Sequence, residues 1–271
     1  MTDQRSPAPH WLGLDGQVCV VSGAGSGIGA AIAQGLAAAG GRVALLDRDA
    51  AAAEAQARAL RETGADALAV PCDVSDAAAV ADAAALVRAR LGPAGVLVNN
   101  AGLLRAGPLA EVDLARWNEV LAVNLTGYLL CARAFGAGMR AAGRGSIVHV
   151  ASISGLFPQT GSGAYSASKA GVLLLSRQLA VEWGPQGVRS NAVCPGMIRT
   201  ALSARFYEEP GFEARRAAVT ASRRIGEPQD IADVALFLAS PRAAYVNGAE
   251  IVVDGGMSSM LMDMVPRPGF N

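Results

Sequence analysis

The chain has 271 residues, a length that suits one large α/β domain or two small ones, and its 23 acidic and 23 basic residues leave a formal net charge of zero. This balance gives no reason to expect nucleic acid or an acidic membrane as a partner. No uninterrupted apolar run is long enough to predict a membrane span, and the polar N-terminus does not resemble a signal peptide. The four cysteines are widely spaced and there are two histidines, so the sequence predicts no metal site and a cytoplasmic protein with reduced thiols.

Short β-branched runs alternate with alanine-rich helical stretches along the chain. The pattern predicts strands at 17–23, 42–47, 67–72, 95–100, 146–152, 188–194 and 249–255. It predicts helices at 27–40, 49–64, 76–91, 109–139, 164–184 and 228–239. Nearly all the strands are continuous apolar runs, which indicates a parallel sheet covered on both faces. We therefore expect an α/β fold with a doubly wound, seven-stranded, Rossmann-like sheet.

No linker or change in composition divides the chain, so the sequence predicts a single domain at 14–271 after an N-terminal extension at 1–13. Two segments do not fit the alternation. Residues 197–227 form a long, charged insertion before the last helix, and such a connection is typically a substrate lid or a mobile loop. Residues 257–271 form a methionine-rich tail that we expect to pack against the domain or a neighbouring subunit.

A glycine cluster, VSGAGSGIG at 21–29, follows the first predicted strand. Glycines at 23, 27 and 29 allow a tight turn and a close approach of the backbone to a pyrophosphate, which the N-terminus of the next helix attracts. The spacing is G-x-x-x-G-x-G, with Gly25 as an extra glycine. Any tight turn between a strand and a helix can use glycines, but the position in the first such turn favours a dinucleotide site.

Asp47 ends the second predicted strand, 18 residues after Gly29. A carboxylate at this place can accept hydrogen bonds from the adenosine ribose and repels a 2′-phosphate, and Ser26 leaves the glycine loop without a cation. Both features favour NAD over NADP. Arg48 is the complication, because an arginine beside the site can bind a 2′-phosphate. Asp47 can also serve simply as a helix cap.

Tyr165 and Lys169 are four residues apart in a predicted helix and therefore share a face. Lys169 is the only lysine in a chain that otherwise uses arginine. An ammonium about 5 Å from a phenol favours the phenolate by roughly 3 kcal/mol at an effective dielectric of about 20, or about two pKa units. The pair is therefore expected to act as an acid/base with a pKa near working pH. A surface pair at helical spacing is the alternative interpretation.

These motifs, together with CDV at 72–74, NNAG at 99–102 and PGMIRT at 195–200, resemble the short-chain dehydrogenase/reductase family from about residue 14 to 257. The resemblance implies that Tyr165 transfers the proton, that Ser152 binds the substrate oxygen and that Lys169 binds the nicotinamide ribose. It implies that Asn124 holds a water that relays protons from the lysine. The interval of thirteen residues to Tyr165 favours Ser152 over the nearby Ser154 as the catalytic serine.

The resemblance also assigns a nicotinamide cofactor, and the expected cofactor is NAD. Asp73 and Val74 are expected at the adenine, and Ile198 and Thr200 at the nicotinamide carboxamide. The complete set of predicted cofactor-binding residues is Gly23, Ser26, Gly27, Ile28, Gly29, Asp47, Arg48, Asp73, Val74, Asn100, Ala101, Gly102, Tyr165, Lys169, Pro195, Ile198 and Thr200. His149, inside the fifth predicted strand, is expected to be packed rather than catalytic.

The predicted function is NAD-dependent transfer of a hydride between a secondary alcohol, such as a sugar or polyol, and its ketone. One alternative is an NADPH-dependent reductase of 3-oxoacyl carrier protein or CoA esters, for which arginines of the insertion would supply a basic entrance: Arg205, Arg215, Arg216, Arg223 and Arg224. The other alternative is a non-catalytic NAD-binding regulator, since fold does not fix function.

Two further expectations concern the substrate and the assembly. The predicted substrate lining mixes apolar and polar side chains: Leu103, Leu104, Leu156, Phe157, Gln159, Arg199 and Arg205. The helix at 164–184 is apolar on more than one face, which predicts burial against a second copy. The family resemblance implies a homo-oligomer, a tetramer or a dimer.

Overall fold

The computed structural model describes residues 11–200, 207–265 and 269. Its central layer is a seven-stranded sheet in the order β3-β2-β1-β4-β5-β6-β7, and every pairing is parallel. The strands are β1 (Val18–Ser22), β2 (Arg42–Asp47), β3 (Ala67–Pro71), β4 (Val96–Asn99), β5 (Gly145–Val150), β6 (Val188–Pro195) and β7 (Glu250–Val253). The predicted doubly wound, Rossmann-like sheet is confirmed.

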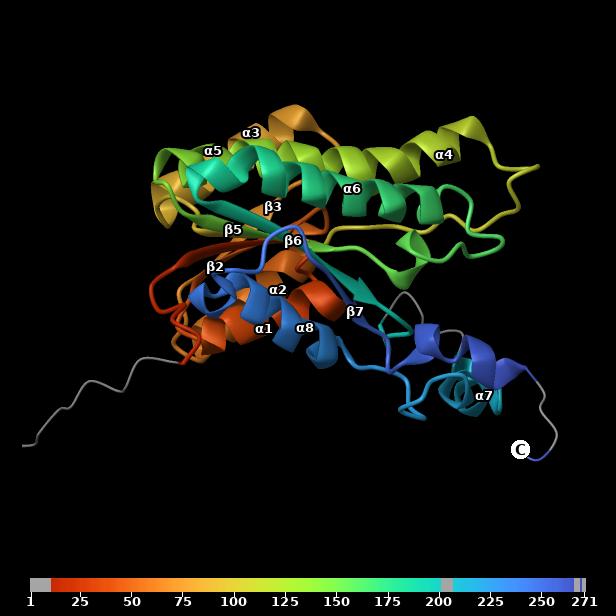
Figure 1. Ribbon diagram of the computed structural model, residues 1–271. Helices are drawn as coiled ribbons and strands as arrows, with labels where there is room; N and C mark the ends of the chain where they lie inside the picture. The colour runs from red at the N-terminus through yellow and green to blue at the C-terminus, as the bar shows by residue number, and fades with distance from the viewer. Residues whose placement is uncertain (1–10, 201–206, 266–268, 270–271) are drawn as a thin grey trace, which may run out of the picture.

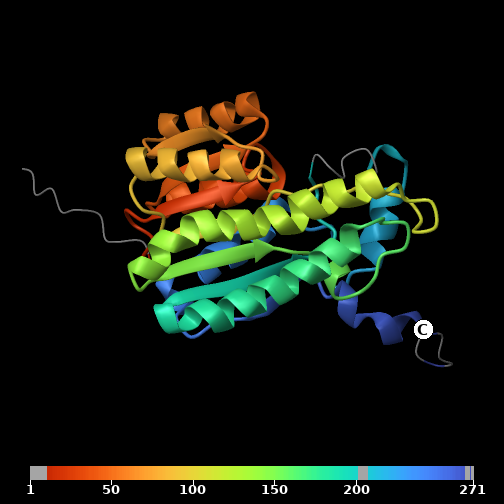
Figure 2. The same ribbon diagram turned by 90° about the horizontal axis from the view of Figure 1, so that it is seen from above.

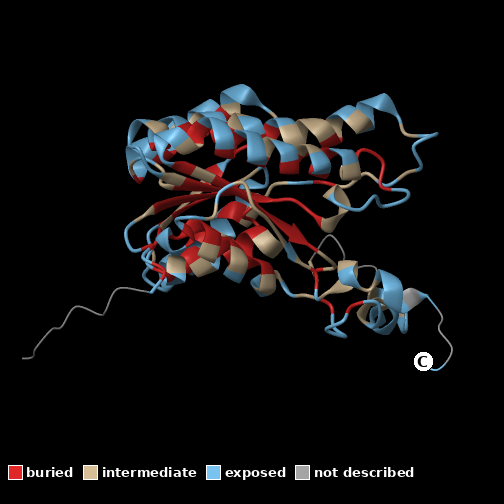
Figure 3. Cartoon of the chain, viewed as in Figure 1, coloured by how far each residue is buried: buried red, intermediate tan, exposed pale blue. Residues whose placement is uncertain are grey.

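Helices cover both faces of this sheet (Figure 1). One face carries α1 (Gly27–Ala38), α2 (Ala50–Glu62) and α8 (Pro228–Ala239). The other face carries α3 (Ala77–Arg90), α5 (Gly127–Ala141) and α6 (Tyr165–Trp183), as Figure 2 shows from above. Two separate apolar cores lie between the sheet and these layers. Strands such as β1 and β2 are buried on both sides (Figure 3), which explains why they are continuous apolar runs rather than alternating ones.

The predicted helix at 109–139 begins later and ends later than expected. The structure has α4 (Leu114–Leu121), one π-helical turn (Ala122–Thr126) and then α5, as one continuous helix. It begins at Leu114 because the Asp113 carboxylate accepts a hydrogen bond from the Ala115 amide, which is an N-cap. Within the described residues, this helix is the one that is long and apolar enough to span a membrane by composition. It packs against β4 and β5, as a core helix of an α/β domain does.

The insertion and the tail lie beyond the carboxyl ends of β6 and β7 (Figures 1 and 2). The insertion carries the short helix α7 (Phe212–Ala218), and the tail forms two 3₁₀ turns (Met257–Ser259 and Leu261–Met264). Residues 1–10 of the predicted extension at 1–13 lie outside the described residues, as do residues 201–206 of the insertion, which include Arg205, and residues 266–268 and 270–271 of the tail.

Candidate active site

The sheet changes direction between β1 and β4, which are neighbours although β2 and β3 separate them in sequence. In open α/β sheets, ligands bind outside the carboxyl ends of the strands at this point. Here Ser22 accepts hydrogen bonds at its hydroxyl from the amides of Asn100 and Ala101 at 3.0 and 3.1 Å. The side-chain amide of Asn100 donates to the carbonyls of Ser22 and Gly23, both at 3.0 Å. The two strand ends are therefore held together as a rigid platform.

The glycine loop passes so close to its neighbours that side chains at several positions would clash with them. A Cβ on Gly29 would lie 2.1 Å from the carbonyl oxygen of Gly23, and one on Gly23 would lie 2.8 Å from the Cα of Ala101. Gly23 and Gly27 also have positive φ angles of 64° and 55°, which disfavour other residues. A Cβ on Gly25 would lie 2.9 Å from Asp47 Oδ2. The loop needs glycine at these positions to pass close to its neighbours.

The N-terminus of α1 follows directly from this loop. Its N-cap residue is Ser26, whose side chain makes no capping hydrogen bond to the described residues. By contrast, α2 and α3 are both capped by aspartates, Asp49 and Asp76. The first amides of α1 therefore face outward with the positive end of the helix dipole, which suits an anionic pyrophosphate.

Asp47 lies at the carboxyl end of β2 and is held by backbone amides. Its Oδ2 accepts from the Gly25 amide at 2.9 Å and its Oδ1 from the Asp49 amide at 3.0 Å. These bonds fix the carboxylate beside the glycine loop, where it fits the two hydroxyls of an adenosine ribose. Asp47 does not cap α2, because Asp49 does so. The cradle of glycines, the open helix end and this carboxylate fit an adenine dinucleotide.

Asp73 and Arg48 lie near each other at the same edge. Asp73 Oδ1 accepts from the amide and the hydroxyl of Ser75, and the pKa of Asp73 is lowered first by these bonds and to a smaller degree by the charge of Arg48. The guanidinium of Arg48 therefore has a carboxylate close by. Val74 packs against Gly127, where a Cβ would lie 2.9 Å from Val74 Cγ2.

Contacts of three further predicted cofactor residues, Gly102, Thr200 and Ile198, are as follows in the structure. A Cβ on Gly102 would lie 3.7 Å from Lys169 Nζ, so Gly102 approaches the lysine closely. A Cβ on Gly27 would lie 3.5 Å from Thr200, which places Thr200 beside the glycine loop. Ile198, which follows Pro195 at the end of β6, forms an isolated β-bridge with Gly226.

Tyr165 begins α6, and Ser152 follows β5 across the crevice. The Ser152 hydroxyl lies near the Tyr165 phenol, since it offsets part of the rise in the phenol's pKa, and Ser152 Oγ accepts from the Ser154 amide at 3.0 Å. Ser154 turns away, because its hydroxyl donates to Gln159 Oε1 at 3.1 Å. The geometry thus pairs Tyr165 with Ser152 rather than with Ser154.

Lys169 is one turn along α6 and is only 3% exposed. Its Nζ donates to the Val150 carbonyl at 2.8 Å and to the Tyr128 hydroxyl at 3.3 Å, and it lies 5.8 Å from the centre of the Tyr165 ring. Gly155 packs on the backbone at Lys169, where a Cβ would lie 2.8 Å from the lysine carbonyl carbon. The lysine is therefore buried, and its ammonium is hydrogen-bonded to Val150 and Tyr128.

The expected net lowering of the Tyr165 pKa is not found in the chain by itself. Burial raises the pKa of Tyr165 above its ordinary value, and the hydrogen bond with Ser152 offsets part of the rise. Burial also lowers the pKa of Lys169 to about 7, so near neutral pH the ammonium is only partly charged. Burial is therefore the largest cause of the shift in the pKa of each group.

Asn124 lies in the π-helical turn, a kind of turn that is frequent at functional sites. Its Oδ1 accepts from the Leu103 amide at 2.9 Å, and its Nδ2 donates to the Leu103 carbonyl at 3.0 Å. Nδ2 also donates to the Ser168 hydroxyl, which in turn donates to the Tyr165 carbonyl at 2.6 Å. Asn124 is thus tied both to the loop after β4 and to the first turn of α6.

His149 is packed, as predicted. Its ring nitrogens face Asn99 at 3.3 Å and Ser190 at 3.2 Å, and burial lowers its pKa to about 3. Sequence reasoning missed Ser168 and Tyr128. Ser168 lies within the YSASK motif, and Tyr128 lies four residues after Asn124, a helical spacing that was available as a signal.

The two loops beside the crevice are hydrogen-bonded to each other. The Gly107 amide donates to the Gly161 carbonyl at 2.8 Å, and the Gly163 amide donates to the Gly107 carbonyl at 3.0 Å. Gly107 and Ser162 form an isolated parallel bridge. The loop after β4 and the loop before α6 are therefore one structural unit.

Comparisons with known proteins agree with this geometry. The family profile described as Enoyl-(Acyl carrier protein) reductase matches residues 23–258. The chain is 46% identical over 247 residues to galactitol 2-dehydrogenase (L-tagatose-forming) of Cereibacter sphaeroides, covering 90% of this chain and 95% of the relative. It is 43% identical over 243 residues to D-threitol dehydrogenase of Mycolicibacterium smegmatis, covering 90% and 93%.

A solved structure is similarly close. Gluconate 5-dehydrogenase from Burkholderia cenocepacia, in complex with NADP and tartrate, superposes with a TM-score of 0.87 at 33% identity and covers 91% of this chain and 96% of its own. Fold and site together define an oxidoreductase with a Rossmann-like sheet. The chain belongs to the short-chain dehydrogenase/reductase family.

Proposed function

We propose that this protein is an NAD-dependent polyol dehydrogenase that converts a secondary hydroxyl to a ketone. The observation that carries the proposal is the placement of Tyr165 beside Ser152 and Lys169, together with the Asp47 carboxylate that a backbone amide fixes beside the glycine loop. A proton-transferring group and a dinucleotide cradle in one crevice are what alcohol oxidation requires.

Ser152, Tyr165 and Lys169 have separate roles in the proposed reaction. Ser152 holds the substrate oxygen, and Tyr165 removes the hydroxyl proton as the carbinol carbon loses its hydride. Lys169 places a positive charge near the phenol, which favours the phenolate once the ammonium is protonated. The nicotinamide, when bound, accepts the hydride, so that alcohol and NAD⁺ become ketone, NADH and a proton.

The preference for NAD rests on Asp47. Its carboxylate is fixed by two backbone amides, so it cannot easily swing away from a 2′-phosphate, and a negative charge at this place repels one. Arg48 is the residue that opposes this preference. Because Asp73 lies near Arg48 and carries a lowered pKa, part of the arginine charge is already balanced.

The polyol class rests on the relatives, whose names specify galactitol, threitol and gluconate. The polar side of the crevice also suits a substrate with several hydroxyls, because Ser154 and Gln159 form a hydrogen-bonded pair close to Ser152. Hydroxyl and amide groups at this place can bind a second hydroxyl of the substrate.

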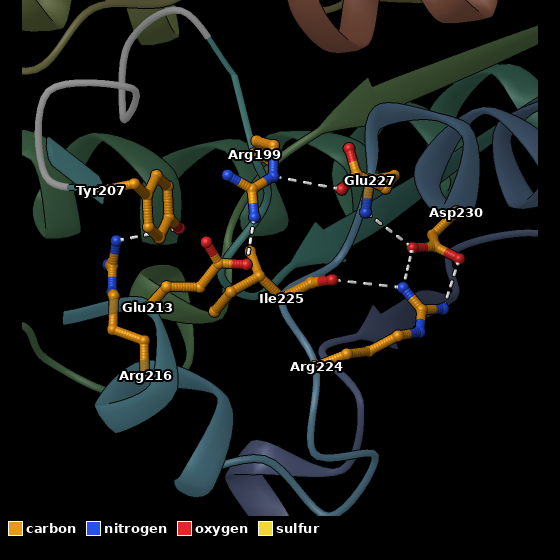
Figure 4. A network of polar contacts seen from close by, with 8 residues as sticks. All are labelled: Arg199, Tyr207, Glu213, Arg216, Arg224, Ile225, Glu227 and Asp230. Atoms are coloured by element: carbon orange, nitrogen blue, oxygen red, sulfur yellow. Dashed lines mark hydrogen bonds and ion pairs between the residues drawn. The ribbon is translucent and has the colours of Figure 1, made fainter. Parts of the chain in front are cut away.

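A basic docking site for an acidic acyl carrier is not favoured, because arginines of the insertion are engaged within the chain (Figure 4). Arg199 pairs with Glu213 and Glu227, and Arg224 makes two bonds to Asp230 at 2.6 and 2.7 Å. Arg215 pairs with Glu209, and Arg216 donates to the Tyr207 hydroxyl at 3.2 Å. Arg199, Arg215 and Arg224 therefore add little positive potential at the entrance, because a carboxylate balances the charge of each.

The function is tested by following NADH formation with purified protein against galactitol, threitol and other polyols, with NAD and NADP in parallel. Oxidation of at least one polyol is expected, with kcat/KM for NAD exceeding that for NADP by at least about tenfold. Reduction of 3-oxoacyl thioesters by NADPH, without polyol oxidation, would establish the alternative instead.

Asp47→Ser is the variant that tests the preference for NAD over NADP in the same assay. It removes the charge and keeps a hydroxyl that can accept from the Gly25 amide. The variant is expected to lose the preference for NAD by about 10- to 100-fold, through weaker NAD use and better NADP use. An unchanged ratio would show that Asp47 does not select the cofactor.

We also propose a homo-oligomer that assembles through α6. Leu174 and Val181 are seven residues apart on one face of this helix, and they are 60% and 76% exposed. Light scattering is expected to give a multiple of the 27.5 kDa chain mass. Leu174→Arg is expected to shift the mass towards the monomer, whereas Leu60→Val, a buried change on α2, should not. A monomeric wild type would contradict the proposal.

A further inference from the structure

Lys169 has a contact that the proposed mechanism does not use. Its Nζ donates to the hydroxyl of Tyr128, a residue of α5, as well as to the Val150 carbonyl. The Tyr128 hydroxyl itself donates to that same carbonyl at 3.0 Å. Ammonium, phenol and carbonyl thus form a closed triangle beneath the crevice.

The direction of each hydrogen bond in the triangle follows from the donors available. A phenol has one hydrogen, and Tyr128 uses it on Val150. The contact to Lys169 must therefore engage a lone pair of the phenol oxygen. Burial raises the pKa of Tyr128 well above its ordinary value, so the group stays a neutral acceptor and does not compete with Tyr165 for protons.

Tyr128 is fixed in place independently of Lys169. Its side chain is 1% exposed, and its ring stacks on that of His149 with centres 5.8 Å apart. The Val150 carbonyl already satisfies the hydroxyl, so packing alone does not require the bond to the lysine. That additional contact directs a rigid acceptor at a buried ammonium, which needs acceptors to remain charged.

We propose that Tyr128 is a positioning residue of the dehydrogenase reaction: its hydroxyl holds the Lys169 ammonium in place and favours its charged form. This inference rests on the oxidoreductase function proposed above. It assigns the rigid support of the lysine to a side chain of α5, four residues after Asn124 on the same helix.

The other titratable groups around Lys169 leave this role to Tyr128. Tyr165 lies on α6 itself, Cys194 on β6 and His149 on β5. Burial raises the pKa of Cys194 to about 12 and lowers that of His149 to about 3, so both are neutral near pH 7. Val150 and Tyr128 are thus the described groups that accept hydrogen bonds from Lys169.

The test is Tyr128→Phe, which keeps the ring and removes the hydroxyl. Loss of an acceptor makes the ammonium harder to charge, so Tyr165 receives less support as a phenolate. The acid limb of kcat/KM for alcohol oxidation is expected to move upward by about one pH unit, with about a tenfold loss at pH 7. NADH binding, followed by fluorescence titration, is expected to weaken several-fold because Lys169 is less well held.

Two further variants separate positioning from a structural effect. Tyr245→Phe, at a fully exposed tyrosine, should change neither measurement. Tyr128→Leu removes the hydroxyl and also the ring. The acid limb of its pH profile of kcat/KM for alcohol oxidation should therefore move upward as far as that of Tyr128→Phe, whatever its Tm. The inference would be overturned if Tyr128→Phe kept both the acid limb of the kcat/KM profile and the NADH affinity of the wild type, even with a lower Tm.

The NADH titration also separates this inference from the proposed function. If the wild type oxidises none of the polyols, the proposed substrate class fails, but weaker NADH binding by Tyr128→Phe would still support the role of Tyr128. If polyols are oxidised and Tyr128→Phe behaves as the wild type does, the proposed function stands and the role of Tyr128 falls.

Discussion

Tyr165→Phe is expected to lower kcat/KM for alcohol oxidation by about 10³-fold while NADH still binds, because general acid–base catalysis typically contributes 10²–10⁴. In the structure the phenol hydroxyl faces Ser152, so its loss removes the group that takes the proton and leaves the rest of the crevice in place. The measurement is steady-state NADH formation with the best polyol from the substrate screen. Fluorescence titration of NADH shows that the cofactor site is intact.

The pH dependence of the wild-type rates of oxidation and reduction is a second test of the role of Tyr165. Oxidation needs the phenolate, and burial raises the pKa of Tyr165, so the oxidation rate is expected to rise with pH through the neutral range and above. Reduction needs the phenol, which stays protonated through the neutral range because the pKa of Tyr165 is raised, so the reduction rate should fall only at strongly alkaline pH. Ser154→Ala is the control, since that hydroxyl is directed at Gln159 and the loss should be only a few-fold. Full activity in Tyr165→Phe would refute the assignment.

Lys169→Arg is expected to cost at least about 10²-fold in kcat/KM although it preserves the positive charge, because a guanidinium is planar and larger than an ammonium. Nζ lies 2.8 Å from the Val150 carbonyl and is closed in by Tyr128, so an arginine must displace one of these neighbours. This explains why a chain that otherwise uses arginine keeps a lysine here. The measurement is kcat/KM together with the dissociation constant of NADH.

Arg177→Lys is the matched control for this exchange. Arg177 lies on the same helix, eight residues further along; its side chain is 55% exposed and pairs with Glu250 at 3.1 Å. Exposed pairs contribute about 0–1 kcal/mol, so the swap should leave kinetics unchanged. Lys169→Met, which removes the charge as well, is expected to be at least as damaging as Lys169→Arg. Near-wild-type rates in Lys169→Arg would mean that charge alone matters at this position.

The strands and most helices could be predicted from the sequence because the local signals agree with burial. The β-branched runs are buried on both faces, and periodic alanine-rich stretches pack between them. The start of α4 was misplaced because residues 109–113 have no strong breaker, and the cap at Asp113 only becomes evident from its bond to the Ala115 amide.

The site was predictable where one motif carries it and not where distant segments meet. Tyr165 and Lys169 share a helix, so their spacing sufficed. Tyr128 reaches Lys169 from another helix, and nothing in either segment alone indicates that contact. The shift in the pKa of Tyr165 was predicted with the wrong sign because the sequence shows a neighbouring charge but not the depth of burial that opposes it. The arginines of the insertion needed the structure for the same reason, since their acidic partners lie up to 28 residues away.

The bridge between Gly107 and Ser162 has a consequence for protein engineering. Because the two loops beside the crevice share main-chain hydrogen bonds, their conformations are not independent. A graft that exchanges one loop with that of a relative would break the bridge and leave unpaired amides at the entrance. Chimeras intended to change substrate range should therefore transfer both loops together, from the same relative, so that the main-chain hydrogen bonds between them are kept.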